Sequence, residues 1–346
     1  MKLSDFDFNL PEELIAQAPA RRRDASRLLV FNRRDGSLTH DRFFNLADHL
    51  PDQPLMLLND TRVIPARLQG QREDTGRPVE MLLLGRTALG VHEAMIKGLA
   101  KLPVNVVLCF GGGRLRARLL EKTDGRARLA LAHEGSLPAL LDEIADMPLP
   151  PYIHRPAGGK GGADDRERYQ TVYAGAPGAI AAPTAGLHFT GELLAKVRSK
   201  GIETAFLTLD VGAGTFLPIR VENVADHKME LENYRIPRAT WNAVVRARSE
   251  GRKILAVGTT TARVLESVDF SAPATGDAAG ATGLFLYPGR SFKTVDRLLT
   301  NFHLPKSSLY LLVCAFAGQE NMARCYQEAI RQNYRFYSYG DAMLIL

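Results

Sequence analysis

The chain has 346 residues, of which 45% are hydrophobic and 24% are charged, and this composition is that of a globular protein with a large core and room for two domains. Its longest apolar run, residues 309–317, is far shorter than the ~20 residues that cross a bilayer, and its first residues lack the apolar core of a signal peptide, so we expect a cytoplasmic protein. The formal net charge of +6 is compatible with a polyanionic partner, although many ordinary enzymes are equally basic.

The N-terminal segment combines a short helical pattern with a cluster of arginines. Residues 10–17 predict a helix, because Pro11 suits a first helical turn and two glutamates lie near the positive end of the helix. An expected strand at 28–31 is preceded by Arg21, Arg22, Arg23 and Arg27. Such a cluster is by default a solvated face, but its position before a strand in a basic protein favours contact with phosphate.

The first strongly apolar strand ends in polar residues. Residues 43–50 are apolar at helical spacing, and 55–58 form a continuous apolar run of the kind that is buried on both faces of a sheet. The strand is followed by Asp60 and Arg62. Open α/β sheets bind ligands at the carboxyl ends of their strands, although a capped turn explains Asp60 equally well.

From residue 63 to about residue 135 the pattern changes to short alternating segments broken by glycines and charged turns. The segments 79–84, 106–110, 114–120 and 127–132 predict a small antiparallel barrel. A short helix at 137–145 and a proline-rich return close this module.

Residues 181–190 read as a binding loop. Small residues let the backbone approach a ligand closely, Pro183 and Gly186 mark a turn, and Thr184 and His188 add hydrogen-bonding groups. The simpler interpretation is a loop with one incidental histidine.

After this loop the chain alternates between helices and strands. Expected helices at 191–200 and 240–250 are followed by strands at 202–209 and 253–257, a pattern that predicts a mainly parallel sheet flanked by helices. A turn follows each of these strands. The first turn contains Asp210, Gly212, Gly214 and Thr215, and the second contains Gly258, Thr259, Thr260 and Arg263. We expect both turns to meet the 181–190 loop at one edge of the sheet. The second turn can offer N–H groups to an anion, or it can simply cap a helix.

The C-terminal part adds an expected strand at 284–287 and two polar segments. Residues 300–308 contain Asn301, His303 and Lys306 ahead of an apolar helix. Residues 334–344 combine aromatic residues with Arg335 ahead of a last strand. Aromatic faces can stack nucleic-acid bases, but more often they belong to a core.

Together these segments resemble one family along the full length of the chain, the S-adenosylmethionine:tRNA ribosyltransferase-isomerase family of queuosine biosynthesis. The matching segments are 10–16, 59–68, 147–153, 169–173, 181–189, 211–216, 257–260, 300–305 and 334–343. The resemblance implies a discontinuous α/β domain, residues 1–62 and 153–346, with a mainly parallel sheet and an inserted antiparallel β-barrel domain, residues 63–152.

The resemblance also implies the reaction. The ribosyl part of S-adenosylmethionine is transferred to 7-aminomethyl-7-deazaguanine at the wobble position of tRNA and isomerised to epoxyqueuosine, with release of adenine and methionine. S-adenosylmethionine is then a consumed substrate, so we expect no cofactor and no metal. The partners are this tRNA and S-adenosylmethionine, without a membrane, and we expect a monomer.

This chemistry needs a base near the ribose 5′ carbon, which the sulfonium acidifies, a proton donor for adenine, and an alkoxide that displaces methionine. The catalytic candidates are His188, Asp210, His227, His303 and Asp60. The candidates for binding S-adenosylmethionine are Thr184, Gly186, Gly212, Gly214, Thr215, Gly258, Thr259, Thr260, Arg62, Arg263 and Asn301. For tRNA they are Arg21, Arg22, Arg23, Arg27, Lys306 and Arg335.

The sequence departs from the family pattern at two positions. Family members usually have histidine where this chain has Asp210 and Glu230. A carboxylate shielded from water can replace a histidine base, so the identity of the base stays open. The alternative function is a tRNA-binding paralogue with lost or altered activity. A generic methyltransferase is disfavoured, because no glycine-rich turn follows the first strand.

Overall fold

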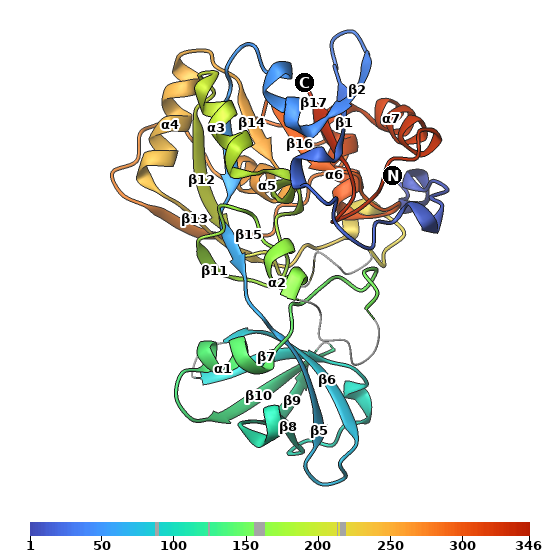
Figure 1. The fold of residues 1–346 in the computed structure, drawn as a ribbon, viewed down its shortest axis with the longest axis vertical. Coiled ribbons are helices and arrows are strands. Elements are labelled where there is room, and N and C mark those ends of the chain that lie inside the picture. The colour runs from blue at the N-terminus through green and yellow to red at the C-terminus, as the bar shows by residue number, and fades with distance from the viewer. Residues whose placement is uncertain (87–89, 124, 156–162, 213, 215–218) are drawn as a thin grey trace.

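The computed structural model describes residues 1–86, 90–123, 125–155, 163–212, 214 and 219–346. Within these residues, nine strands form one large mixed sheet (Figure 1). In spatial order the strands are β15 (Ala278–Thr282), β13 (Glu232–Ile236), β12 (Thr204–Leu209), β3 (Leu55–Asn59), β14 (Ile254–Val257), β16 (Arg297–Asn301), β17 (Ala342–Ile345), β1 (Arg27–Phe31) and β2 (Leu38–Arg42). The central strands β12, β3, β14 and β16 run parallel, whereas the pairs at the edges, β13 with β15 and β1 with β2, are antiparallel.

Side-chain alternation on the central strands creates a core on each face of the sheet. Leu55 and Leu57 of β3 pack into one core with helices α4 (Arg238–Ser249), α5 (Thr259–Ser267), α6 (Ser308–Ala317) and α7 (Gln319–Arg331). Met56 and Leu58 point to the other face and pack with α3 (Gly191–Ser199). Because both faces are covered, the strand has no polar residue until its last position, Asn59.

Two of the helices begin at a residue whose side chain caps them. Thr190 precedes α3, and its hydroxyl accepts the N–H of Leu193 at 3.1 Å. Ser307 caps α6 in the same way, with the N–H of Tyr310 at 3.2 Å. Such caps satisfy N–H groups that have no partner inside the helix.

The second body is a closed antiparallel barrel, in the order β10-β7-β6-β5-β8-β9, which lies below the large sheet in Figure 1. Leu115, Ala117 and Leu119 of one strand fill its interior, and the residues between them face outward. Helix α1 (Leu137–Ile144) packs against the barrel core. The barrel strands are β5 (Arg67–Arg72), β6 (Pro78–Arg86), β7 (Val91–Ile96), β8 (Val107–Phe110), β9 (Leu115–Thr123) and β10 (Arg126–His133). The predicted combination of an α/β sheet with an antiparallel barrel is confirmed.

Smaller elements join the two bodies. Strands β4 (Thr61–Val63) and β11 (Ala176–Ala179) form a parallel pair near the point where the chain leaves the sheet, and α2 (Ala163–Arg168) lies close by (Figure 1). Short 3-10 turns occupy Leu3–Phe6, Glu12–Leu14, Arg23–Ala25, Phe43–His49, Leu99–Lys101, Gly111–Gly113, Thr184–His188 and Val224–Asp226. Among the described residues, no helix has the length and apolar character needed to cross a membrane.

Two local predictions are wrong. The expected helix at 10–17 is a 3-10 turn, because Leu14 and Ala16 exchange backbone hydrogen bonds with Phe336 instead of continuing a helix. The expected strand at 284–287 is a loop, and the nearby strand is β15. Leu286 of this loop is buried in the core, so its apolar character reflects docking and not strand pairing.

Candidate active site

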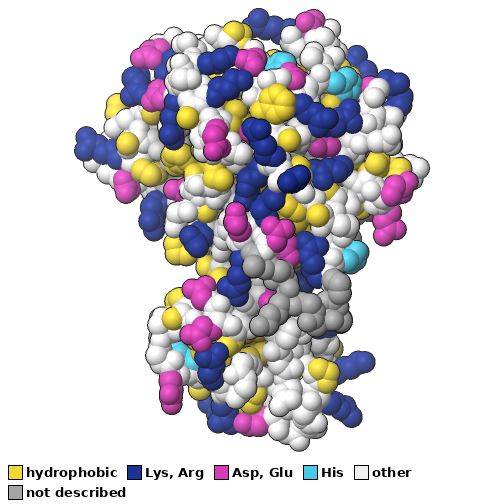
Figure 2. All heavy atoms as spheres, viewed as in Figure 1, with side chains coloured by type: hydrophobic (Ala, Val, Ile, Leu, Met, Phe, Trp, Pro, Cys, Tyr) yellow, Lys and Arg dark blue, Asp and Glu magenta, His cyan; other side chains and the backbone are white. Residues whose placement is uncertain are grey.

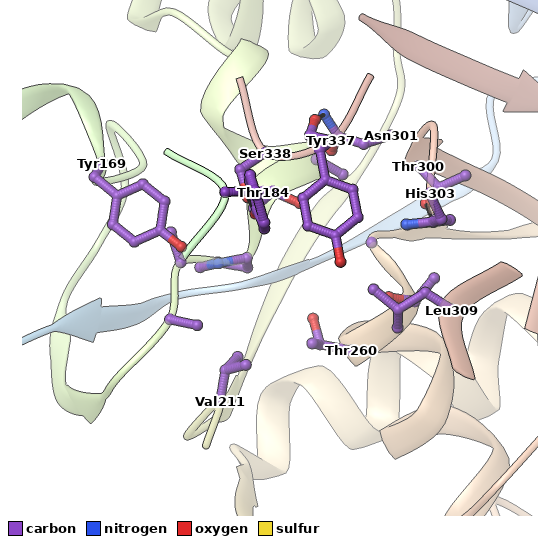
Figure 3. Close-up of a pocket in the computed structure, with 17 residues that line it drawn as sticks. Tyr169, Thr184, Val211, Thr260, Thr300, Asn301, His303, Leu309, Tyr337 and Ser338 are labelled. Carbon is purple, nitrogen blue, oxygen red and sulfur yellow. Dashed lines mark hydrogen bonds between the residues drawn. The ribbon is translucent and has the colours of Figure 1, made fainter. Parts of the chain in front are cut away.

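A pocket of about 560 Å³ lies at the carboxyl ends of the central strands (Figure 3). Its walls come from the 181–185 segment, from Val211 beyond β12, from Gly258–Thr260 between β14 and α5, and from the 300–303 segment that ends β16. The expected convergence of two turns with the 181–190 loop is therefore present, through Val211 in the first turn and Gly258–Thr260 in the second, and the 300–303 segment joins them. Four aromatic or polar residues and one leucine complete the wall: Tyr152, Tyr169, Tyr337, Ser338 and Leu309.

Two buried polar atoms of this wall have no hydrogen-bond partner among the described residues. They are the hydroxyl of Thr260 and the amide oxygen of Asn301. Figure 3 shows the side chains of Tyr169, Tyr337 and Thr260 pointing toward the same central space. Buried groups without partners are costly, so these atoms are suited to bonds with a bound molecule.

The backbone at the start of α5 contributes further donors. Gly258 has φ +89°, a conformation that favours glycine, and this places the first turn of α5 at the pocket wall. The first N–H groups of a helix have no partner within the helix and carry partial positive charge. Thr259 and Thr260, in that turn, are 6% and 7% exposed.

The pocket wall is electrically neutral. None of the described residues that line it is Lys, Arg, Asp or Glu. Burial raises the pKa of Tyr337 to about 12, and it also raises the pKa of Tyr152, so both phenols stay protonated at neutral pH. A cationic or polar ligand here meets aromatic faces and hydroxyls rather than countercharges.

His303 is the imidazole in the wall of this pocket. Its Nε2 lies 2.8 Å from the Thr300 hydroxyl, and its backbone N–H donates to the Tyr326 hydroxyl at 3.0 Å. Burial lowers the pKa of His303 to about 3, so the ring is neutral at physiological pH. A neutral imidazole can accept a proton from a bound molecule.

His188 lies behind the wall and not in it. Its Nδ1 is 2.7 Å from the Ser26 hydroxyl, its Nε2 is 3.1 Å from the Asn301 amide nitrogen, and its ring stacks on Phe43 with centroids 4.9 Å apart. The bond from the same Asn301 nitrogen to the carbonyl of Tyr337, at 3.1 Å, identifies this atom as the amide nitrogen, which donates. His188 Nε2 therefore accepts from Asn301, and the proton on Nδ1 is donated to the Ser26 hydroxyl. Burial lowers the pKa of His188 to about 3. Because it accepts a hydrogen bond from the Asn301 amide, the neutral His188 ring fixes the orientation of Asn301.

Asp60 and Asp210 lie outside this pocket. Asp210 faces a different hollow of about 850 Å³ and accepts the Thr61 hydroxyl at 3.0 Å, and burial raises its pKa. Asp60 accepts the Thr208 hydroxyl at 2.7 Å. Val211 lines the pocket, and because neighbouring residues of an extended chain point to opposite sides, Asp210 points away from it.

The other charged candidates near this edge have different surroundings. Arg263 is buried in an ion pair with Glu232, and its Nε donates to the carbonyl of Leu284 at 3.0 Å. Glu232 also accepts the N–H of Gly212 at 2.9 Å. Arg62 is exposed on β4. Neither arginine lines the pocket.

The remaining described candidates do not line the pocket. His227 packs its ring on Phe285 with centroids 4.9 Å apart, and burial lowers its pKa. Gly186 lies under Tyr173, where a Cβ would come within 2.2 Å of the phenol oxygen. Gly214 lies against Glu230, which forms an ion pair with Arg126 of the barrel. Thr215 lies outside the described residues.

The basic candidates for tRNA binding divide into two groups. Arg21 and Arg22 are exposed, and Arg22 pairs with Asp24 at 2.8 Å. The others are anchored: Arg23 and Arg335 donate to backbone carbonyls, Arg27 lies 3.7 Å above the Tyr334 ring, and Lys306 donates to Asp7 at 2.7 Å. Figure 2 shows Lys and Arg side chains gathered across the middle of this face, above α2.

The comparison with known families follows the same segments. A model of a family described as "Queuosine biosynthesis protein" matches residues 3–345. The chain belongs to this family.

Similar proteins within and near this family match over the full length. Proteins named S-adenosylmethionine:tRNA ribosyltransferase-isomerase from Caldanaerobacter subterraneus subsp. tengcongensis and Staphylococcus haemolyticus are 47% and 46% identical, each over 100% of both chains. A crystal structure of S-adenosylmethionine tRNA ribosyltransferase from Thermotoga maritima is 34% identical, with a TM-score of 0.56, and covers 99% of this chain and 100% of that one.

For this member of the queuosine biosynthesis family, sequence reasoning missed part of the pocket wall. Tyr152, Tyr169 and Tyr337 lie in segments that carry the family resemblance, but aromatic residues in such segments usually belong to a core. Tyr152 and Tyr337 pack edge to face with centroids 3.8 Å apart. Within the described residues, no group of three His, Cys, Asp or Glu is arranged to hold a metal ion.

Proposed function

We propose that this chain is an S-adenosylmethionine:tRNA ribosyltransferase-isomerase. It transfers and isomerises the ribosyl moiety of S-adenosylmethionine onto 7-aminomethyl-7-deazaguanine at the tRNA wobble position, which gives epoxyqueuosine and releases adenine and methionine. The observation that carries this proposal is the full-length match, at 46–47% identity, to proteins that bear this name. A pocket suited to a nucleoside at the strand ends supports it.

The pocket suits the nucleoside part of S-adenosylmethionine. Thr260 and Tyr169 offer hydroxyls, and Asn301 offers an amide oxygen, to the ribose hydroxyls and the adenine edge. The sulfonium is a cation without N–H groups, and aromatic faces such as those of Tyr152 and Tyr337 attract cations without needing a hydrogen bond. Thr184, Gly258 and Thr259 line the same wall, and we assign them to substrate binding.

The same wall offers a proton acceptor. We assign this role to His303, because its neutral ring faces the pocket while Asp60, Asp210 and His227 lie elsewhere. It takes the proton from the ribose 5′ carbon, and the electron pair stays on that carbon beside the sulfonium. Its lowered pKa makes it a weak base, so the acidity conferred by the sulfonium supplies part of the driving force.

We assign His188 to positioning. It holds the Asn301 amide so that the amide oxygen faces the pocket, and it does not itself line the pocket. No cofactor is needed in this scheme, because S-adenosylmethionine is consumed.

For the domains, we propose that residues 1–62 and 153–346 form the catalytic part and that 63–152 form an insertion, whose barrel contacts tRNA and whose last residue, Tyr152, joins the active-site wall. Residues 67–133 contain twelve Lys and Arg and six Asp and Glu, so their formal charge of +6 equals that of the whole chain. Arg114, Arg116 and Arg118 alternate with buried residues and face outward at one end of the barrel sheet. Such a surface suits an RNA backbone. A monomer in the cytoplasm, where tRNA is modified, fits this role.

The test is incubation of the protein with S-adenosylmethionine and tRNA that carries the precursor base, followed by assay of free adenine. We expect adenine release that depends on both substrates. Binding of the tRNA without adenine release would support the non-catalytic paralogue instead, and S-adenosylhomocysteine as the product would show methyl transfer.

A further inference from the structure

A second, smaller hollow of about 260 Å³ adjoins the active-site pocket. Arg23, Arg168 and Arg335 line it, together with His188 and Ser338. Ser338 also lines the active-site pocket, and His188 is hydrogen-bonded to Asn301 of that pocket at 3.1 Å. Ser338 and the contact between His188 and Asn301 therefore connect the walls of the two hollows.

The three guanidinium groups are held in place by backbone carbonyls. Arg23 donates to Glu167 at 2.8 Å and to Leu187 at 3.2 Å. Arg335 donates to the carbonyl of Ala18 at 3.1 Å, and Arg168 donates to that of Ala20. The Nε of Arg168 is buried without a hydrogen-bond partner among the described residues. Carbonyl partners fix a guanidinium without neutralising its charge.

The positive charge of this hollow is only partly compensated, because Glu167 and Asp164 act electrostatically on Arg23 without lining the hollow. No Asp or Glu is among the described residues that line it. Asp341 lies 3.9 Å from an Arg335 nitrogen, but its two oxygens already accept the backbone N–H groups of Arg27 and Arg335, each at 2.8 Å. Burial and the charge of Arg168 lower the pKa of Arg23, and Arg335 and Arg23 add to the effect of burial in lowering the pKa of His188.

The active-site pocket, in contrast, has no cationic side chain in its described wall. Both substrates of the proposed reaction are anionic in part, because S-adenosylmethionine carries a carboxylate and tRNA carries phosphates. Arg62 and Arg263, the two arginines expected to pair with the carboxylate, do not line that pocket. A substrate that extends past Ser338 would meet the three arginines.

We propose that this arginine pocket binds an oxyanion of a substrate while the nucleoside part occupies the neighbouring active-site pocket. The inference rests on the proposed function. A tRNA phosphate and the methionine carboxylate share the required chemistry, since both accept paired N–H groups from a guanidinium.

The kinetic test uses Arg335→Ala, with Arg42→Ala as the matched control. Arg42 also donates to a backbone carbonyl, that of Ala25 at 3.0 Å, but it is exposed and does not line the hollow. Initial rates of adenine release are measured against each substrate in turn. We expect Arg335→Ala to raise KM for one substrate by about tenfold or more, with a smaller change in kcat, and Arg42→Ala to leave both KM values unchanged.

The affected substrate identifies the oxyanion. A higher KM for tRNA with a flatter salt dependence indicates a phosphate, and a higher KM for S-adenosylmethionine indicates the carboxylate. Arg335→Lys keeps the charge and should recover part of the loss, which separates charge from misfolding. If both KM values for Arg335→Ala match those of the control, the proposal is wrong.

A binding assay separates this inference from the proposed function. Titration with inorganic phosphate, followed by 31P NMR, should show saturable binding in the unmodified protein and in Arg42→Ala, and about tenfold weaker binding in Arg335→Ala. If the unmodified protein releases no adenine but shows this pattern, the proposed reaction is wrong and the anion site stands. If adenine is released but phosphate binding does not depend on Arg335, the anion site is wrong.

Discussion

Replacement of Thr260 by valine should make the free protein more stable and the enzyme less active. Thr260 is 7% exposed, and its hydroxyl faces the pocket without a partner among the described residues. An unsatisfied buried hydroxyl costs about 1–3 kcal/mol, and valine keeps the branched β-carbon, so we expect the free energy of unfolding to rise by about 1 kcal/mol and Tm by about 2 °C.

The same change removes a hydrogen bond to bound S-adenosylmethionine. A neutral hydrogen bond contributes about 0.5–1.5 kcal/mol, which corresponds to about a 2- to 10-fold fall in kcat/KM. The assays are chemical denaturation of the free protein and initial rates of adenine release. A gain in stability combined with a loss of activity is the result expected of a substrate-binding residue.

The neighbouring Thr261 supplies the control. It is fully buried, but its hydroxyl donates to the carbonyl of Val257, the last residue of β14, at 2.7 Å. Thr261→Val should therefore lower the free energy of unfolding by about 0.5–1.5 kcal/mol. If Thr260→Val lowers stability to the same degree and leaves kcat/KM unchanged, the assignment of Thr260 to the substrate is refuted.

Four further changes test other parts of the account. His188→Ala should lower kcat about tenfold or more while tRNA affinity stays the same, because the histidine acts through Asn301; equal losses in rate and tRNA binding would point to a purely structural residue. The pKa values of His188 and His303 are about 3 in the folded protein and near 6.5 in the unfolded chain, so the stability due to their neutral forms is present above pH ~6.5 and is lost as the pH falls toward 3. The free energy of unfolding of His303→Gln should therefore depend less on pH in that window than that of the unmodified protein. An unchanged pH dependence would contradict the argument that burial keeps His303 neutral. The double change Arg114→Ala and Arg118→Ala should weaken tRNA binding and reduce the slope of its salt dependence by about 2, with no change in KM for S-adenosylmethionine. An unchanged slope would mean that these barrel arginines do not contact tRNA phosphates. Arg21→Ala with Arg23→Ala should also weaken tRNA binding, and a loss of folding stability without a change in salt dependence would mean that Arg23 serves only its backbone partners.

The sequence predicts the general arrangement of the site well. Glycines and hydroxyl residues directly after buried strands predict turns at one sheet edge, and Gly258, Thr259 and Thr260 do lie beside residues 181–185 in one pocket. This works because the carboxyl ends of parallel strands must share an edge. The barrel is equally predictable, because Leu115, Ala117 and Leu119 alternate with polar residues.

The direction of individual side chains is harder to predict. Asp210 and Val211 are neighbours at the end of β12, yet Val211 faces the pocket and Asp210 does not. A shift of one residue reverses the side that each side chain faces, and the sequence does not define where the strand ends so finely. His188 illustrates the same limit, because its bonds to Ser26 and Asn301 join segments far apart in the chain.

The most direct test of the account is a balance of products in one reaction. Free adenine, free methionine and the modified wobble nucleoside should be quantified together after incubation of the protein with S-adenosylmethionine and precursor-bearing tRNA. We expect equal amounts of all three, each dependent on both substrates. Formation of S-adenosylhomocysteine, or adenine released without a change in the nucleoside, would contradict it.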